Sequence, residues 1–189
     1  MRRAFFLQKV WLICFLVIGL WASPAWAQEN PDEIPNTLVI GGGWQEVFKN
    51  TPYSNGGDFR LEHRWGLSLL SAAADFFKPL DGGFQIHPFM GLETTTSLQF
   101  YGFGGLIFDF LVGRHLVISP NFAVGHYSRG EGKKLGCPLE FRSTIETGLR
   151  FEGGWRVTAY LSHTSNDNIG DKNPGVEHAG FYLHIPLNP

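Results

Sequence analysis

The feature of this sequence that most constrains its fold is a series of eight segments in which apolar and polar residues alternate, separated by turn-like residues. The segments are 37–48, 58–70, 84–94, 98–110, 114–127, 139–151, 154–165 and 176–187. A period of two is typical of a β-strand with one apolar and one polar face, and a tilted strand of about 9–11 residues spans a bilayer. The pattern predicts an all-β chain, an eight-stranded antiparallel transmembrane β-barrel of the outer-membrane type.

The lengths of the connections agree with this prediction. Short connections at 112–113 and 152–154 are expected to be periplasmic turns, and longer ones at 49–57, 128–138 and 166–175 external loops. Such an alternation is typical of outer-membrane barrels. A soluble lipocalin-like barrel is the structural alternative, because it also has eight antiparallel strands, but it would turn its apolar residues inward. Since side chains fill the interior of a narrow eight-stranded outer-membrane barrel, it is a poor pore, and function is expected on a rim, a loop or the outer wall.

Residues 1–27 open with MRR, continue through an apolar run and end in AWA, which predicts a signal peptide cleaved after Ala27. A membrane anchor is the alternative, although Lys9 limits the apolar run to about 17 residues. Cleavage leaves residues 28–189 as the barrel domain of an exported protein of the bacterial outer membrane. It removes basic but no acidic residues from a chain of net charge −2, so no nucleic-acid partner is expected. Cys137 then remains alone, without an intramolecular disulfide partner.

The last predicted hairpin, 154–187, carries residues suited to chemistry. One apolar face of its first strand consists of Trp155, Val157, Ala159 and Leu161. One face of its second strand consists of Ala179, Phe181, Leu183 and Ile185. Extending each register in steps of two places His163 and Ser165 on the first face and Glu177 on the second. We therefore expect an alcohol, an imidazole and a carboxylate to project from the apolar wall beside one external loop.

This set of groups is the one that nucleophilic acyl transfer requires. A serine hydroxyl becomes reactive when an imidazole takes its proton, and a carboxylate orients that imidazole. His163 and Ser165 are about 7 Å apart along one strand face, so their side chains can meet. The asparagines of the loop and Gly175 offer amide donors for an oxyanion. The alternative is that these polar residues only mark the membrane interface.

A second H-x-S motif tests the argument from spacing. His126, Ser128 and Glu140 repeat the same separations, so spacing alone does not discriminate. His126 and Ser128 share an apolar face, whereas Glu140 alternates with Phe141 and is expected on the polar face of its strand. This set should therefore not assemble. Two charged sets are expected to line the lumen: Asp58, Arg60, Glu62 and Arg64 from one strand, and Glu140, Arg142 and Glu146 from another.

The stretch HTSNDNIGDKNPGVE, residues 163–177, followed by a terminal strand ending in FYLHIPL, resembles the lipid A 3-O-deacylase family, the PagL-like acyloxyacyl hydrolases. The resemblance implies an outer-membrane esterase that removes an ester-linked acyl chain, at the 3-O position, from the lipid A of lipopolysaccharide through an acyl-enzyme. It implies His163 as general base, Ser165 as nucleophile and Glu177 as orienting acid. Asn166 and Asn173 match positions of the oxyanion region, the first through its backbone.

The implied partner is lipid A or lipopolysaccharide in the outer leaflet, with the barrel embedded in the membrane. No cofactor is implied, and no metal is expected, because the seven histidines show no metal-ligand spacing. Asp167 departs from the family, which usually has alanine there, and a carboxylate beside an oxyanion would oppose catalysis unless the loop turns it into solvent. The charges of RGEGKK, 129–134, are expected to be solvated, with contact to lipid phosphates as the alternative. The rival function is a non-catalytic structural or adhesive barrel.

Overall fold

The structure is a computed structural model and describes residues 35–49, 52, 56–66 and 83–187. The predicted signal peptide and residues 67–70 of the predicted strand 58–70 lie outside the described residues, and this strand already ends at Arg64. The strands are β1 (Thr37–Gln45), β2 (Gly57–Arg64), β3 (Phe84–Thr95), β4 (Phe100–Val112), β5 (Leu116–Ile118), β6 (Asn121–Ser128), β7 (Leu139–Arg150), β8 (Arg156–Ser165) and β9 (Val176–Pro186). A 3-10 turn, η1 (Glu152–Gly154), joins β7 to β8. Among the described residues, no helix has the length and apolar character needed to cross a membrane.

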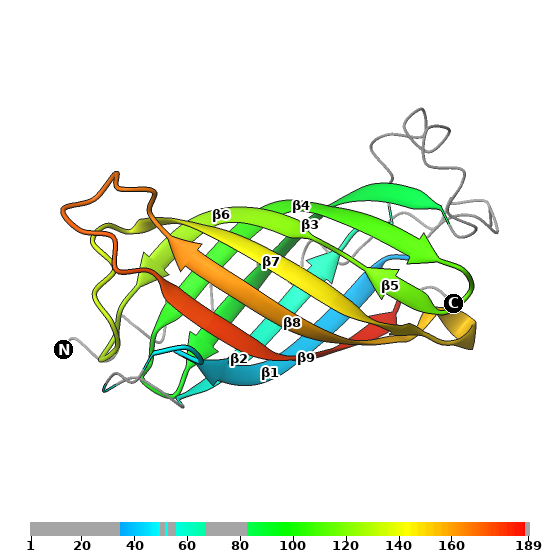
Figure 1. Ribbon diagram of the computed structural model, residues 1–189, viewed down its shortest axis with the longest axis horizontal. Helices are drawn as coiled ribbons and strands as arrows, with labels where there is room; N and C mark the ends of the chain where they lie inside the picture. Colours follow the sequence, from blue (N-terminus) through cyan, green and yellow to red (C-terminus); the bar gives the residue numbers. More distant parts are fainter. Residues whose placement is uncertain (1–34, 50–51, 53–55, 67–82, 188–189) are drawn as a thin grey trace. The chain divides into compact units, whose positions relative to one another are not determined.

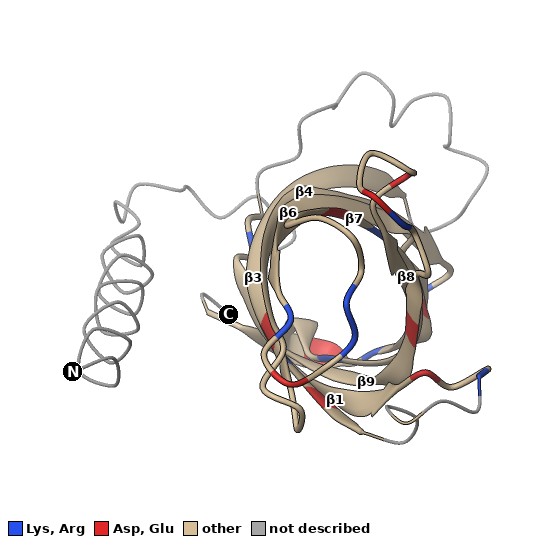
Figure 2. Ribbon diagram, turned by 90° about the vertical axis from the view of Figure 1, so that its left-hand side faces the viewer, with Lys and Arg blue, Asp and Glu red and all other residues tan. Residues whose placement is uncertain are grey.

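The strands form one antiparallel sheet that closes on itself (Figures 1 and 2). The order is β3-β2-β1-β9-β8-β7-β5-β4-β6, and the additional pairings β3–β4 and β7–β6 complete the ring. β5 and β6 both pair with β4 and with β7, so together they occupy the position of a single strand in the barrel. The predicted eight-stranded antiparallel barrel is therefore confirmed.

Two predicted strand boundaries are wrong for local reasons. The expected strand 114–127 is divided at Ser119 and Pro120, because proline has no N–H to donate to the ladder. Pairing continues across the gap, since Ser119 N donates to Glu146 O at 2.9 Å and Phe108 N to Pro120 O at 2.9 Å. The expected strand 37–48 ends at Gln45, because Glu46 has a left-handed φ of 56°.

The outer wall of the barrel is apolar. Trp44, Phe59 and Phe181 are 53%, 56% and 60% exposed, and they alternate along their strands with buried residues. Most of the polar and charged side chains of the strands are buried in the lumen. A lipocalin-like barrel would have the opposite arrangement, so this alternative is excluded. An apolar wall around a polar interior is the arrangement that suits a lipid environment.

Ion pairs fill the lumen as the sequence predicts. Arg64 contacts Glu62 and Glu146, both at 2.7 Å, and Arg142 contacts Glu62 at 3.0 Å. Arg60 lies 2.9 Å from Asp58. Buried charges are stable when each is paired and hydrogen-bonded in this way. The interior is therefore a packed network and not an open pore.

Candidate functional site on the outer wall

The centre of the candidate site is a contact between two adjacent strands. His163 of β8 and Glu177 of β9 are direct cross-strand partners. The distance from His163 Nδ1 to Glu177 Oε1 is 3.3 Å. The His163 side chain is 51% exposed and that of Glu177 is 15% exposed. Because Nδ1 faces the carboxylate, Nε2 is the imidazole atom left for a reacting group.

Ser165 is the last residue of β8 and shares the outer face with His163, two positions away. Its cross-strand partner on β7 is Phe141. Among the described residues, the Ser165 hydroxyl makes no hydrogen bond, so the structure brings together His163 and Glu177 and leaves Ser165 beside them. Hydrogen bonds of this type are often long before substrate binds and shorten in the complex.

Two lysines from other segments bind the chain at 174–177, and the sequence gives no signal of this role. Lys49 Nζ donates to Glu177 Oε1 at 2.9 Å and to Pro174 O at 3.3 Å. Lys133 Nζ donates to Gly175 O at 2.6 Å and pairs with Glu46 at 2.5 Å. The expectation that the charges of the 129–134 loop are solvated is therefore wrong for Lys133, whose ammonium is largely buried in these contacts, and the contacts favour a structural role over contact with lipid phosphates.

Gly175 leaves room for the imidazole of His163 because it has no side chain. Its φ is +58°, and a Cβ added to it would lie 2.6 Å from His163 Cε1. A side chain at 175 would therefore meet the imidazole and would also be strained by the left-handed backbone. The structure shows that the Gly175 carbonyl oxygen accepts a hydrogen bond from Lys133, and the amide-donor role of Gly175 stays a prediction.

The asparagines of the loop bind to each other and to a neighbouring loop. Asn166 N donates to Asn173 Oδ1 at 3.1 Å. The Asn166 side chain is fully buried, and its Nδ2 donates to Leu135 O and Lys172 O, both at 2.9 Å. Asn166 therefore joins the loops 129–138 and 166–175 at the end of the barrel that faces the viewer in Figure 2. Its N–H and its side-chain amide are both engaged by protein in this conformation.

The residues after Asn166 adopt left-handed conformations. Asp167 and Asn168 have φ values of 52° and 63°, and both side chains are exposed. Asparagine and aspartate tolerate this region better than other non-glycine residues. The turn is closed by Ile169 N, which donates to Asn166 O at 3.0 Å. The carboxylate of Asp167 is thus directed into solvent.

The second H-x-S motif does not assemble, as the sequence predicts. His126 and Ser128 are exposed on β6, and His126 pairs with Leu139. Glu140 is fully buried in the lumen, where Tyr101 Oη donates to its backbone oxygen at 2.9 Å. The barrel wall therefore lies between Glu140 and the other two side chains.

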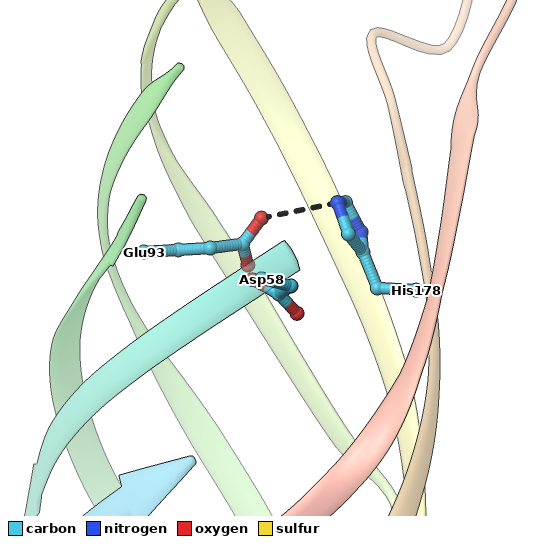
Figure 3. Close-up of side chains that lie close together, drawn as sticks. All are labelled: Asp58, Glu93 and His178. Carbon is cyan, nitrogen blue, oxygen red and sulfur yellow. Dashed lines mark ion pairs between the residues drawn. The ribbon is translucent and has the colours of Figure 1, made fainter. Parts of the chain in front are cut away.

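One further cluster of titratable groups lies inside the barrel, not on its wall. Asp58, Glu93 and His178 are buried and could offer ligand atoms within 4.8 Å of one another (Figure 3). The positive charge at this place comes from arginines: Arg60 Nε lies 2.9 Å from Asp58 and 3.1 Å from Glu93, and Arg142 lies 3.2 Å from Glu93. This cluster belongs to the ion-pair network of the lumen.

The wall adjoining the candidate site is apolar along β7, β8 and β9. Ile145 is the cross-strand partner of Leu161, and Leu161 is the partner of Ala179. Phe181 is 60% exposed on the same face. His163 and Glu177 thus stand at the polar end of an apolar surface.

These features define a class: a small outer-membrane β-barrel with a serine and a histidine–carboxylate pair on its outer wall. A family model described as lipid A 3-O-deacylase (PagL) matches residues 39–186. The chain belongs to this family, which confirms the resemblance that the last hairpin indicates.

Two solved structures have a similar fold. One is the crystal structure of the outer membrane enzyme PagL, with a TM-score of 0.63 and 19% identity, covering 80% of this chain and 99% of that one. The other, from de novo design of transmembrane β-barrels, has a TM-score of 0.51 and 7% identity, covering 84% of this chain and 100% of that one. No curated protein sequence matches this chain.

Proposed function

We propose that this chain is an exported lipid A 3-O-deacylase of the serine-hydrolase type, with Ser165 as nucleophile, His163 as general base and Glu177 as the carboxylate that orients it. The observation that carries the proposal is the 3.3 Å contact between His163 Nδ1 and Glu177 Oε1 on the outer wall of a barrel of this family. Ser165 on the same face of β8 supplies the hydroxyl.

In the first half of the reaction, Ser165 Oγ attacks the carbonyl carbon of the 3-O ester and its proton passes to His163 Nε2. The tetrahedral intermediate collapses, the bond from the carbonyl carbon to the sugar oxygen breaks, and His163 returns the proton to that oxygen. In the second half, water attacks the acyl-serine and gives a proton to His163, which passes it to Ser165 as the fatty acid leaves. The Glu177 carboxylate stabilises the imidazolium formed in each half.

The location of the site matches the place of the substrate. Acyl chains in the outer leaflet can reach groups on the lipid side of the barrel but not groups in the lumen. The apolar surface that includes Leu161 and Phe181 offers contact to such a chain, while the exposed His163 stands near the polar rim. This arrangement supports lipid A or lipopolysaccharide as substrate.

For the oxyanion, we assign the donor role to the loop that follows Ser165. The Asn173 Oδ1 atom is held by Asn166 N, which leaves Asn173 Nδ2 as a donor beside the site. The Asn166 amide becomes a second donor only if substrate displaces its bond to Asn173. An engineered amide-to-acid change, Asn173→Asp, removes the Nδ2 donor with little change in size and should lower kcat by about 10²-fold, as loss of one oxyanion donor typically does.

The proposal is tested with the mature chain refolded in detergent micelles that contain lipopolysaccharide, in water enriched in ¹⁸O. Mass spectrometry should show lipid A that lacks one ester-linked acyl chain and a released fatty acid that carries one ¹⁸O atom. Unchanged lipid A would contradict the proposal and would favour a non-catalytic structural or adhesive barrel.

A further inference from the structure

The connection after β1 brings a cation to the candidate site from a distant part of the chain. Glu46 N donates to Glu177 O at 2.6 Å, which attaches this connection to the start of β9. Lys49 N then donates to Glu46 O at 3.2 Å and closes a turn. The result is that the Lys49 side chain, 40% exposed, reaches the carboxylate of Glu177.

Lys49 and His163 share one oxygen of that carboxylate. Glu177 Oε1 lies 2.9 Å from Lys49 Nζ and 3.3 Å from His163 Nδ1. The other oxygen, Oε2, is buried and has no hydrogen-bond partner. Lys49 therefore makes the hydrogen bond that fixes the orientation in which Oε1 faces the imidazole.

The charged groups that face Glu177 are Lys49 from the connection after β1, His163 from β8 and Lys133 from the loop after β6. Lys133 Nζ forms an ion pair with Glu46 at 2.5 Å and donates to Gly175 O at 2.6 Å. Lys49 is thus the cation in direct contact with the carboxylate. It also donates to Pro174 O at 3.3 Å, so it holds the backbone that leads to Glu177.

We infer that Lys49 is a positioning residue for the deacylation, which orients Glu177 against His163 and balances its negative charge. The inference rests on the proposed function, because it assigns Lys49 to the same site. Without Lys49, the carboxylate loses the hydrogen bond that holds Oε1 toward the imidazole and the cation that balances its charge. Either loss leaves His163 less able to accept the Ser165 proton.

The test compares Lys49→Met, Lys49→Arg and a matched control, Lys172→Met, by kinetics on lipopolysaccharide over a range of pH. Lys172 is an exposed lysine of the 166–175 loop whose ammonium makes no ion pair among the described residues. For Lys49→Met we expect kcat to fall about tenfold, with KM changed by less than about twofold, since the carboxylate acts on the barrier and not on lipid binding. The acid limb of the pH–rate profile should move to higher pH, because the Lys49 cation no longer opposes the uptake of a proton by the histidine–carboxylate pair.

Lys49→Arg should recover most of the activity, because it restores a cation that can reach the carboxylate, and Lys172→Met should match the wild type. In a background of Glu177→Gln, Lys49→Met should add almost no further loss, because the two residues act as one unit. A folded barrel in each variant is checked by the heat-dependent mobility of the protein in gels.

Two kinds of failure are distinguishable. If the wild type releases acyl chains but Lys49→Met keeps the wild-type kcat and acid limb, the role of Lys49 is overturned and the proposed function stands. If Lys49→Met loses activity with no shift of the acid limb and with a full further loss in the Glu177→Gln background, Lys49 only supports the fold. If neither the wild type nor Lys172→Met is active, the proposed function itself fails.

Discussion

His163 of β8 and Glu177 of β9 lie directly opposite each other, with 3.3 Å between Nδ1 and Oε1. The pair is held on the outer face of two hydrogen-bonded strands, so its geometry depends on the ladder more than on a loop. Rigid elements hold a reacting pair more accurately than loops do.

The first prediction concerns the charge of Glu177. Glu177→Gln keeps the size of the side chain but removes the charge that stabilises an imidazolium, so kcat should fall by about 10²-fold or more. The control is Glu140→Gln, which changes the carboxylate of the second H-x-S motif inside the lumen. Release of fatty acid from lipopolysaccharide measures both, and equal activity of the two variants would contradict the assigned role of Glu177.

The second prediction concerns Gly175. Gly175→Ala places a methyl group 2.6 Å from His163 Cε1, and it also strains a φ of +58°. Gly113→Ala strains a φ of +62°, but its Cβ would meet nothing within 4 Å. Both variants should lose about 1–2 kcal/mol of unfolding free energy, while Gly175→Ala alone should lose about 10²-fold in kcat, as small misplacements of a catalytic group do. Matching kcat values would show that the contact with His163 does not matter.

The third prediction concerns Asp167, which lies two positions after Ser165 in the 166–175 loop. Its carboxylate is exposed, so water screens its effect on an oxyanion formed at Ser165. In water the repulsion between two unit charges beyond contact distance is below about 1 kcal/mol, so Asp167→Asn should raise kcat by less than about fivefold. The control is Asp171→Asn, an exposed acid farther along the same loop, for which no change is expected. A gain in both variants would point to bulk charge and not to the oxyanion.

The fourth prediction concerns the lumen. Arg142 is fully buried between Glu62 at 3.0 Å and Glu93 at 3.2 Å. Arg142→Met leaves both carboxylates without this partner and should lower the unfolding free energy by about 3–5 kcal/mol. Arg114→Met, at an exposed turn, should change it by less than about 0.5 kcal/mol. Urea unfolding of the barrel in lipid vesicles measures both, and equal midpoints would mean that the network does not stabilise the fold.

The sequence predicts the barrel well because its fold rests on a period of two. Each strand must alternate to face lipid and lumen, so the register of Leu161 and Phe181 also places His163 and Glu177. The same rule separates the two H-x-S motifs, since Glu140 alternates with Phe141 and turns inward. The alternating pattern does not predict where strands end. Their ends depend on single residues, such as Pro120, which lacks an N–H, and Glu46, which has a left-handed φ.

The contacts that hold the candidate site in place cannot be predicted from the alternation of apolar and polar residues. Lys49 and Lys133 reach residues 174–177 across 125 and 42 positions of the chain, and each looks like an ordinary loop lysine in the sequence. The resemblance implies an oxyanion role for the Asn166 backbone, but nothing in the sequence indicates that its side chain is buried and joins two loops. Such contacts depend on how loops pack at the rim, which no periodicity encodes.

The central claim is that Ser165 is the nucleophile, and its most direct test is a pair of alanine variants. Ser165→Ala and Ser128→Ala each remove one hydroxyl from an H-x-S motif on the outer wall, and both should fold as stably as the wild type. Mass spectrometry of lipid A after incubation should show that Ser128→Ala removes the 3-O acyl chain at the wild-type rate, while Ser165→Ala is slower by about 10³-fold or more. Deacylation by Ser165→Ala at a rate near that of Ser128→Ala would contradict the account.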